Sequence, residues 1–271
     1  MSAHWLPGPL LVAGPCVLEN DDLHLRVAEA LAGLAARLGL RVIFKASYLK
    51  ANRSRPDTPR GPGLDRGLRM LERVRDASGL PVLTDVHESQ EAAAAAAVAD
   101  YLQVPAFLAR QTPLLEAAGR TGRPVNIKKG QWMDPEEMVG AAEKLRRAGC
   151  ADVAVTERGT FFGYGDLVVD MRSFRRLRDV TGGFVLFDAT HAVQQPGRGA
   201  GGTSGGRRRH VPDLLCAAAA AGADGFFLET HPDPAVAPSD AETMWPLADL
   251  ESLVERALGV WHGVQGRTVD A

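Results

Sequence analysis

The chain has 271 residues, of which 45% are hydrophobic and 24% charged, as is typical of a folded globular protein. Its formal net charge of −2 argues against the broad positive field that attracts nucleic acid or an anionic membrane. No apolar run approaches the roughly 18 residues of a membrane span, no signal peptide is recognisable, and the 3 cysteines are too widely separated to suggest a disulfide framework. We therefore expect a cytoplasmic protein that binds neither nucleic acid nor membrane.

Short runs rich in β-branched and aromatic residues alternate with amphipathic helical patterns along the chain. In chain order, the predicted strands span residues 10–14, 41–47, 81–87, 100–106, 124–130, 151–159, 183–191 and 224–232. Helical patterns such as 21–39 and 64–79 lie between them. Asp21 and Asp134 stand where N-caps belong, and Gly39, Gly79 and Gly149 where helices should end. Eight strand–helix units in a chain of this length predict one α/β domain, a (β/α)8 TIM barrel spanning residues 1–271.

The competing architecture is a doubly wound open sheet. That fold seldom needs eight such regular units, and no GxGxxG sequence follows the first predicted strand. The glycine-rich segment 194–206 falls within a connection between a strand and a helix. We therefore interpret it as a candidate lid and not as a domain boundary.

A polar or ligating side chain stands at the end of every predicted strand. Active sites of TIM barrels form at the C-terminal ends of the strands, so these side chains should converge on one rim. In chain order they are Cys16, Lys45 with Ser47, Asp85 with His87, Gln103, Lys128, Arg158, His191 and Glu229. One polar strand end is unremarkable, but eight on one rim predict a functional site.

Four residues could bind a metal ion at this rim. Cys16, His191 and Glu229 end three different strands, and Asp240 lies in the loop after the last one. A thiolate, an imidazole and two carboxylates suit Zn²⁺, Fe²⁺ or Mn²⁺ better than Mg²⁺. Taken singly, each residue has a plainer interpretation, since a lone cysteine is most often a small buried apolar side chain.

Positive charge is also concentrated at the predicted rim. Lys45, Lys50, Arg53, Lys128 and Arg158 would surround one mouth, an arrangement that suits phosphorylated anions better than stability, because like charges repel. Only 5 of the 31 basic residues are lysine, so a lysine at the rim could mark a place where a planar guanidinium would not serve.

The remaining basic residues have plainer interpretations. Lys144 should lie on a solvated helix face, and Lys129, whose side chain should alternate away from that of Lys128, is a second candidate for solvent exposure. The arginines at 207–209 open a predicted helix, where positive charge is unfavourable, so a partner subunit, an anion or, as the plainest interpretation, solvent should accommodate them.

The chain resembles the 3-deoxy-D-manno-octulosonate 8-phosphate synthases over nearly its whole length. Matching segments include AGPCVLE, FKASYLKANRS, TDVHE, QVPAFLARQT, VNIKKGQ, FDATHAVQQPG, LETHPDP and PSDAET. The resemblance implies a TIM barrel, usually a homotetramer, that condenses phosphoenolpyruvate with D-arabinose 5-phosphate and water and releases phosphate. It also implies a transferase of lipopolysaccharide biosynthesis, because the product leads to a sugar of bacterial lipopolysaccharide.

The resemblance assigns roles to individual residues. Those expected to hold phosphoenolpyruvate are Lys45, Ser47, Gln103, Lys128 and Arg158. Lys50, Asn52 and Asp85 would hold the aldose, Arg53 and Ser54 its phosphate, and Arg110 would reach across from a neighbouring subunit. The expected catalytic residues are Lys45, Lys50, Asp85 and His191.

The resemblance further implies a metal-dependent enzyme. A metal-independent branch of the family carries Asn where this chain has Cys16, and the residues Cys16, His191, Glu229 and Asp240 are all present. The chain departs from the family pattern at Arg55, at Gly165-Asp166 and in its glycine-rich lid. These departures bear on lid motion and sugar-phosphate affinity, not on the type of reaction.

Three other functions compete with this assignment. The 3-deoxy-D-arabino-heptulosonate 7-phosphate synthases share the barrel, phosphoenolpyruvate and the metal ligands, but typically carry KPRTS where this chain has KANRS. Sialic-acid synthases normally carry an additional C-terminal domain. A non-catalytic barrel that binds sugar phosphates as a regulator would keep the cations without needing the metal ligands.

Overall fold

Eight parallel strands close into a barrel in the computed structural model, which describes residues 4–6, 8–52, 58–199 and 204–265. The strands are β1 (Leu10–Gly14), β2 (Arg41–Lys45), β3 (Val82–Asp85), β4 (Tyr101–Val104), β5 (Val125–Lys128), β6 (Val153–Glu157), β9 (Phe184–Asp188) and β12 (Gly225–His231). Pairing of β1 with β12, in the register Leu10 to Gly225, closes the ring. The predicted TIM barrel is confirmed.

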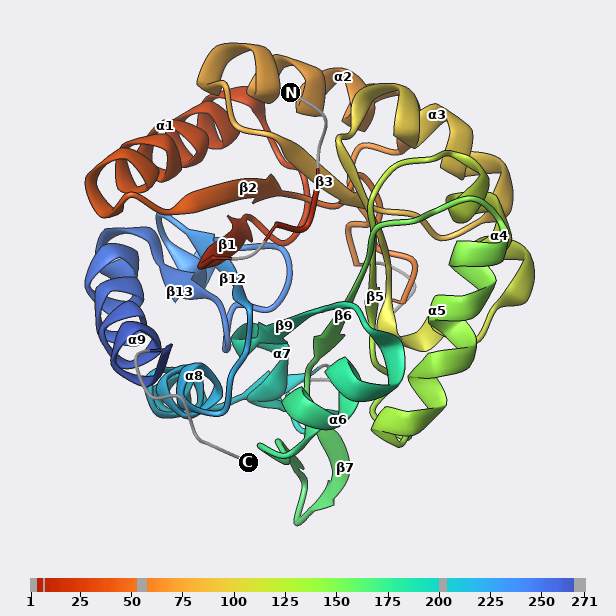
Figure 1. The fold of residues 1–271 in the computed structure, drawn as a ribbon. Helices are drawn as coiled ribbons and strands as arrows, with labels where there is room; N and C mark the ends of the chain where they lie inside the picture. The colour runs from red at the N-terminus through yellow and green to blue at the C-terminus, as the bar shows by residue number, and fades with distance from the viewer. Residues whose placement is uncertain (1–3, 7, 53–57, 200–203, 266–271) are drawn as a thin grey trace.

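Helices surround the barrel as a continuous ring when it is viewed along its axis (Figure 1). They are α1 (Asp21–Leu38), α2 (Leu64–Ser78), α3 (Ala92–Val98), α4 (Thr112–Arg120), α5 (Met138–Arg147), α6 (Ser173–Thr181), α8 (Val211–Ala220) and α9 (Leu250–Gln265). A single helical turn, α7 (Ala189–Ala192), follows β9 directly. No helix in the described ranges is long and apolar enough to cross a membrane.

The predicted helix ends agree with the structure in part. Gly39 and Gly79 end α1 and α2 in the left-handed conformation, at φ 59° and 69°, as expected. Asp134 caps a short 3₁₀ helix (Pro135–Glu137), also as expected. The N-cap of α1, however, is Asn20 and not Asp21, because the Asn20 side chain accepts the hydrogen bond from the Leu23 backbone N–H.

The core fills both the barrel interior and the space between strands and helices. The outward faces of the strands pack against the helices in one large cluster, and a smaller cluster inside the barrel ends at Trp5. Gly14 is required at the end of β1, because a Cβ there would lie 2.2 Å from the carbonyl oxygen of Lys45. This close approach brings the loop that carries Cys16 against the end of β2.

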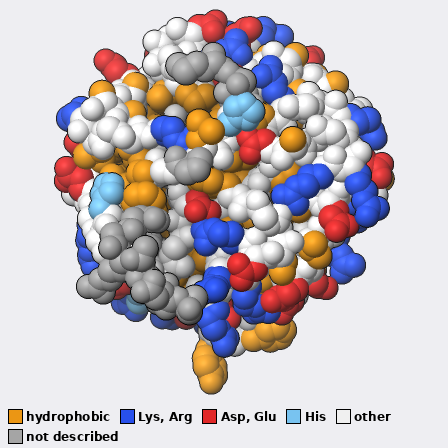
Figure 2. Space-filling view, viewed as in Figure 1, with side chains coloured by type: hydrophobic (Ala, Val, Ile, Leu, Met, Phe, Trp, Pro, Cys, Tyr) orange, Lys and Arg blue, Asp and Glu red, His pale blue; other side chains and the backbone are white. Residues whose placement is uncertain are grey.

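Two short hairpins extend the connections on either side of β9. Strands β7 (Thr160–Gly163) and β8 (Asp166–Val168) form an antiparallel hairpin that projects from the ring in Figure 1. Its tip exposes Phe162 and Tyr164 almost fully, and hydrophobic side chains stand out at the same edge in Figure 2. Strands β10 (Gln194–Gln195) and β11 (Gly205–Gly206) bracket the glycine-rich segment, and β13 (Trp245–Pro246) pairs with the end of β12.

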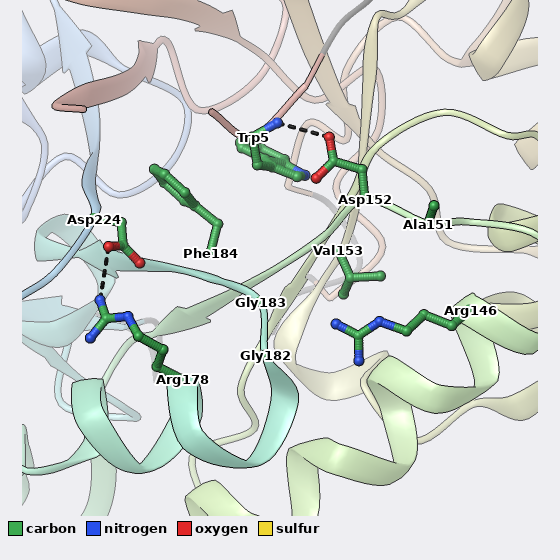
Figure 3. A pocket seen from close by; sticks show the side chains of 10 residues that line it. All are labelled: Trp5, Arg146, Ala151, Asp152, Val153, Arg178, Gly182, Gly183, Phe184 and Asp224. Carbon is green, nitrogen blue, oxygen red and sulfur yellow. Dashed lines mark hydrogen bonds and ion pairs between the residues drawn. The ribbon is translucent and has the colours of Figure 1, made fainter. Parts of the chain in front are cut away.

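A hollow of about 320 Å³ lies at the N-terminal end of the barrel (Figure 3). Its lining includes Trp5, Arg146 and Phe184, together with an ion pair between Arg178 and Asp224. None of the predicted site residues lines it. On the face of the molecule drawn in Figure 2, positively and negatively charged side chains are mixed, and neither sign forms a broad patch. The near-neutral net charge leads one to expect this.

Candidate active site

The predicted site residues that end the barrel strands do converge. Lys45, Asp85 and Lys128 are the last residues of β2, β3 and β5, while Gln103 and Glu229 lie near the ends of β4 and β12. All five are at most 6% exposed. Charged side chains are rarely this buried unless they are paired or functional.

The Lys45 ammonium group stands at the centre of the first network. It lies 3.0 Å from Ser47 Oγ, 3.2 Å from Glu229 Oε1 and 3.4 Å from Asp85 Oδ2. Burial alone would lower the pKa of Lys45, but the carboxylates of Asp85 and Glu229 outweigh it and raise that pKa. Burial likewise opposes ionisation of Asp85, yet Lys45 and Lys50 hold the pKa of Asp85 well below its usual range. Both groups are therefore ionised at neutral pH.

A chain of side-chain hydrogen bonds crosses the barrel from Asp85. Asp85 Oδ1 accepts from Gln103 Nε2 at 2.5 Å, and Asp85 Oδ2 accepts from the Ser47 hydroxyl. Gln103 Oε1 accepts from Asn126 Nδ2 at 2.8 Å, and Asn126 Oδ1 accepts from the Thr156 hydroxyl at 2.8 Å. These bonds fix which end of the Gln103 amide faces Asp85.

Lys128 belongs to a second network, which is centred on Asp188 at the end of β9. Its Nζ lies 2.5 Å from Asp188 Oδ2 and 3.5 Å from the centre of the Phe227 ring. Asp188 Oδ2 also lies 2.7 Å from His191 Nδ1, and Asp188 Oδ1 accepts from the His191 backbone N–H. Burial lowers the pKa of Lys128, although Asp188 opposes that effect.

Arg158 lies at the edge of the same mouth and has capacity for an anion. Its Nη2 donates to Gln194 Oε1 at 2.7 Å, and Gln194 Nε2 donates to Asp240 Oδ1 at 2.6 Å. Its Nη1 is buried and has no hydrogen-bond partner among the residues that the structure describes. An unsatisfied buried guanidinium N–H is costly, so a ligand oxygen is its natural partner.

Three of the four predicted metal ligands lie together. The ligand atoms of Cys16, Glu229 and Asp240 all fall within 4.8 Å of one another. Glu229 Oε2 is buried and has no hydrogen-bond partner in the described part of the chain, and Cys16 Sγ donates to Asp240 Oδ2 at 3.0 Å. Burial and the Glu229 charge raise the pKa of Cys16, so the group is a thiol here and would need a cation to become a thiolate. This donor set fits a divalent transition metal or zinc.

His191 stands beside this group, with Nε2 at 3.8 Å from Glu229 Oε1. Because its Nδ1 faces Asp188, its Nε2 is the nitrogen left for a ligand. Asp240 holds a left-handed backbone at φ 55°, an uncommon conformation for a non-glycine residue. The structure thus places all four residues at one side of the mouth.

The other predicted residues are less centrally placed or lie outside the described ranges. Lys50 Nζ is 3.9 Å from Glu229 Oε1, and Asn52 is exposed. Arg53 and Ser54 are among the residues that the structure does not describe, as is Arg55. Arg110 is two-thirds exposed, and its closest charged neighbour is Glu137 at 3.9 Å.

One expectation from the sequence is wrong. Lys129 alternates away from Lys128 as predicted, but its side chain is fully buried instead of solvated. The outward face of a barrel strand meets the surrounding helices and loops, not water. Lys129 is accommodated by hydrogen bonds and by Glu157, whose Oε2 lies 3.7 Å from its Nζ.

Comparison with known proteins now supplies the family. A profile of the DAHP synthetase I family matches residues 8–259. The chain belongs to the DAHP synthetase I family. The matched range includes every strand of the barrel.

Curated relatives place the chain more narrowly within the DAHP synthetase I family. A 2-dehydro-3-deoxyphosphooctonate aldolase from Acidithiobacillus ferrooxidans is 51% identical over 257 residues, covering 95% of this chain and 91% of the relative. Relatives of the same name from Nitratidesulfovibrio vulgaris and a Synechococcus species are 53% and 52% identical, covering 93% and 94% of this chain and 91% and 89% of each relative. The membership predicted from the sequence motifs is confirmed.

Sequence reasoning missed several residues of the site. Asp188 was hidden inside a predicted strand that was extended to His191, whereas β9 ends at Asp188 and α7 begins there. The signal was available, since Asp188 is an acidic residue after four apolar strand residues and ends β9 as Asp85 ends β3. Gln194, Asn126 and Phe227 gave no such signal, because their roles depend on contacts between strands.

Proposed function

We propose that the chain catalyses the condensation of phosphoenolpyruvate with D-arabinose 5-phosphate and water, giving 3-deoxy-D-manno-octulosonate 8-phosphate and phosphate. Identity above 50% with 2-dehydro-3-deoxyphosphooctonate aldolases over nearly the whole chain supports this reaction. The observation that carries it is the convergence of buried Lys45, Lys128 and Arg158 on one mouth, where Arg158 Nη1 has no partner among the described residues. Such a group suits a small, highly charged anion.

Phosphoenolpyruvate lies between the two networks in this proposal. Lys45 and Lys128 both lie over the Phe227 ring, at 5.5 and 3.5 Å from its centre, and Arg158 offers to the phosphate or carboxylate the Nη1 that has no partner among the described residues. The reaction joins C3 of the enol phosphate to the aldehyde carbon of the sugar, water adds at C2, and phosphate leaves. The cations offset the repulsion between the two anionic substrates and hold the reacting carbons in place.

The aldose occupies the side of the mouth near Asp85. Asp85 is ionised and already fixed by Ser47 and Gln103, so it offers a rigid hydrogen-bond acceptor for sugar hydroxyls. Lys50 and Asn52 extend this side, and the predicted phosphate ligands Arg53 and Ser54 follow directly in sequence. The KANRS segment distinguishes this chain from the KPRTS pattern of heptulosonate synthases.

A divalent metal completes the site in this proposal, held by Cys16, Glu229, Asp240 and His191. When bound, it supplies Lewis acidity and orients the aldehyde or the attacking water. The clustered donor atoms and the unpartnered Glu229 Oε2 support the metal-dependent branch. Asp188 supports it as well, because it fixes the ring of His191 through Nδ1.

The functional unit in this proposal is a homotetramer in the cytoplasm. Phe107 and Trp132 stack at 5.9 Å on the loops after β4 and β5 while remaining about half exposed, which suits burial against another subunit. Arg110 extends into solvent from the same loop region. There it could serve the phosphate site of a neighbouring subunit.

Incubation of the purified protein with both substrates tests the proposed reaction. We expect release of one phosphate per eight-carbon keto-acid phosphate detected by mass spectrometry, and neither product with Lys128→Met. Binding of both substrates without phosphate release would instead support the non-catalytic regulator. Phosphate release from phosphoenolpyruvate with D-erythrose 4-phosphate, but not with D-arabinose 5-phosphate, would support a heptulosonate synthase.

A further inference from the structure

Lys129 has no role in the proposed reaction, although it directly follows Lys128. Its side chain points to the other side of β5 and is fully buried. The Nζ atom lies 3.2 Å from the Gly130 carbonyl oxygen, 3.3 Å from the Met133 carbonyl oxygen and 3.2 Å from Thr160 Oγ1. Two connections of the barrel therefore meet at one ammonium group.

The arrangement fits lysine and no other cation. An ammonium group has three N–H donors, and three oxygens surround Lys129 Nζ at hydrogen-bonding distance. The planar guanidinium of arginine would need its acceptors in one plane and more space in a closed pocket. This accounts for one of the few lysines in a chain that otherwise prefers arginine.

Glu157 completes the arrangement from β6. Its Oε2 lies 3.7 Å from Lys129 Nζ, and its Oε1 accepts from the Gly159 backbone N–H at 2.6 Å. The Phe161 backbone N–H donates to the Gln131 carbonyl oxygen at 3.0 Å, so the two loops are also tied directly. Lys129 thus fixes residues 130–133 after β5, and Glu157 fixes the turn after β6.

Both loops begin at residues that the proposed function assigns to phosphoenolpyruvate. Lys128, the last residue of β5, directly precedes Lys129, and Arg158 directly follows Glu157, the last residue of β6. The Lys129–Glu157 pair, called the brace below, is therefore one residue away from each binding group. Movement of either loop would displace the ammonium or guanidinium group relative to the other. A displacement of about 1 Å is enough to cost a well-positioned site up to roughly a hundredfold in rate.

We propose that Lys129 and Glu157 are positioning residues that set the distance between Lys128 and Arg158 and thereby the affinity for phosphoenolpyruvate. The inference rests on the proposed function for the identity of the substrate. Neither residue touches the substrate, because both side chains lie behind the strands that carry the binding groups. The plainer alternative is an ion pair that contributes to stability alone.

Lys129→Met tests the two alternatives through separate Michaelis constants. We expect KM for phosphoenolpyruvate to rise about tenfold or more, because the two cations lose their relative placement. KM for D-arabinose 5-phosphate should stay within about twofold, since the proposed aldose ligands Asp85 and Lys50 belong to β3 and to the loop after β2, not to the two loops that Lys129 and Glu157 hold. Rates are measured well below the unfolding midpoint of each variant, so that a loss of folded protein cannot mimic the effect. Lys144→Met, at a partly exposed position of α5 outside the two loops, is the matched control.

Two further variants keep the test decisive if Lys129→Met does not fold. Thr160→Val removes one of the three acceptors and keeps the buried Lys129–Glu157 ion pair, and it should raise KM for phosphoenolpyruvate several-fold. The pair Lys129→Met with Glu157→Met restores charge balance and should recover stability, but not affinity for phosphoenolpyruvate. Recovery of both stability and affinity for phosphoenolpyruvate in the double variant would overturn the inference. Equal rises in the Michaelis constants for both substrates in the single variants would also overturn it.

Equilibrium dialysis of radiolabelled phosphoenolpyruvate separates failure of this inference from failure of the proposed function. Absence of binding to the wild-type protein would refute the proposed function and with it the brace. Wild-type binding with unchanged affinity in Lys129→Met and Thr160→Val would refute the brace alone. Weaker binding in both variants, with Lys144→Met unaffected, is the result that we expect.

Discussion

Replacing Lys128 by arginine keeps the charge and changes only the shape of the group that carries it. The Lys128 ammonium fits between Asp188 Oδ2 at 2.5 Å and the Phe227 ring centre at 3.5 Å, and the side chain is 8% exposed. A guanidinium is planar and extends beyond the position of a single nitrogen. It can pair with Asp188 only by moving toward the space that the substrate needs.

The size of the effect follows from the packing. Forcing a larger group into a closed site typically costs about 1–3 kcal/mol. At about 1.4 kcal/mol per tenfold change in rate, kcat/KM for phosphoenolpyruvate should fall by roughly 10- to 100-fold. The charge itself is preserved, so the loss measures geometry. The effect should appear mainly when phosphoenolpyruvate is the varied substrate.

Initial rates of phosphate release with varied phosphoenolpyruvate provide the assay. Lys144→Arg is the control, because Lys144 is a partly exposed residue of α5 outside the barrel rim, and its kinetics should match the wild type. If Lys128→Arg retained kcat/KM within about twofold, the close fit between Asp188 and Phe227 would have no functional meaning, and the argument from the scarcity of lysine would fail with it.

Three further predictions concern the metal, the fold and pH. Cys16→Asn should retain measurable activity, lose bound metal and become insensitive to chelator; metal analysis that finds equal tight occupancy in both proteins would rule Cys16 out as a ligand. Gly67→Ala should lower the free energy of unfolding by about 1–3 kcal/mol, because a Cβ there would lie 2.4 Å from Tyr48 Cβ. Gly140→Ala, with open space around its Cβ, is the control in denaturant titration, and similar results for the two would contradict the packing argument. His24 has its pKa lowered by burial from 6.5 to about 4, so it is neutral when folded and takes up a proton on unfolding. The free energy of unfolding should therefore fall by up to about 3 kcal/mol as pH drops from 6.5 to 4, and His24→Gln should flatten that dependence. Parallel pH profiles of unfolding for the variant and the wild type would refute this role of His24.

The fold was predictable because every unit repeats the same simple pattern. A short β-branched strand ends on a polar residue, and an amphipathic helix follows, so the positions of Lys45, Asp85 and Glu229 at strand ends sufficed to place them on one rim. Helix starts were less certain, because Asn20 and Asp21 are both good N-caps and only the hydrogen bond to Leu23 decides between them.

The site was predictable only where it depends on strand ends. Lys129 was misjudged because alternation tells which side of a strand a residue faces, but not that loops after β5 and β6 close over it. Asp188 was missed because a strand and a one-turn helix could not be separated by periodicity. The chain of hydrogen bonds through Asn126 depends on register between neighbouring strands, which no local pattern encodes.

The choice of aldose tests the central claim most directly. The measurement is kcat/KM for D-arabinose 5-phosphate and for D-erythrose 4-phosphate at saturating phosphoenolpyruvate, followed as phosphate release in the presence of Mn²⁺. We predict that the five-carbon aldose is used at least about a hundredfold more efficiently, a difference of roughly 2.7 kcal/mol in transition-state binding. Equal efficiency for the two aldoses, or a preference for D-erythrose 4-phosphate, would contradict the proposed function.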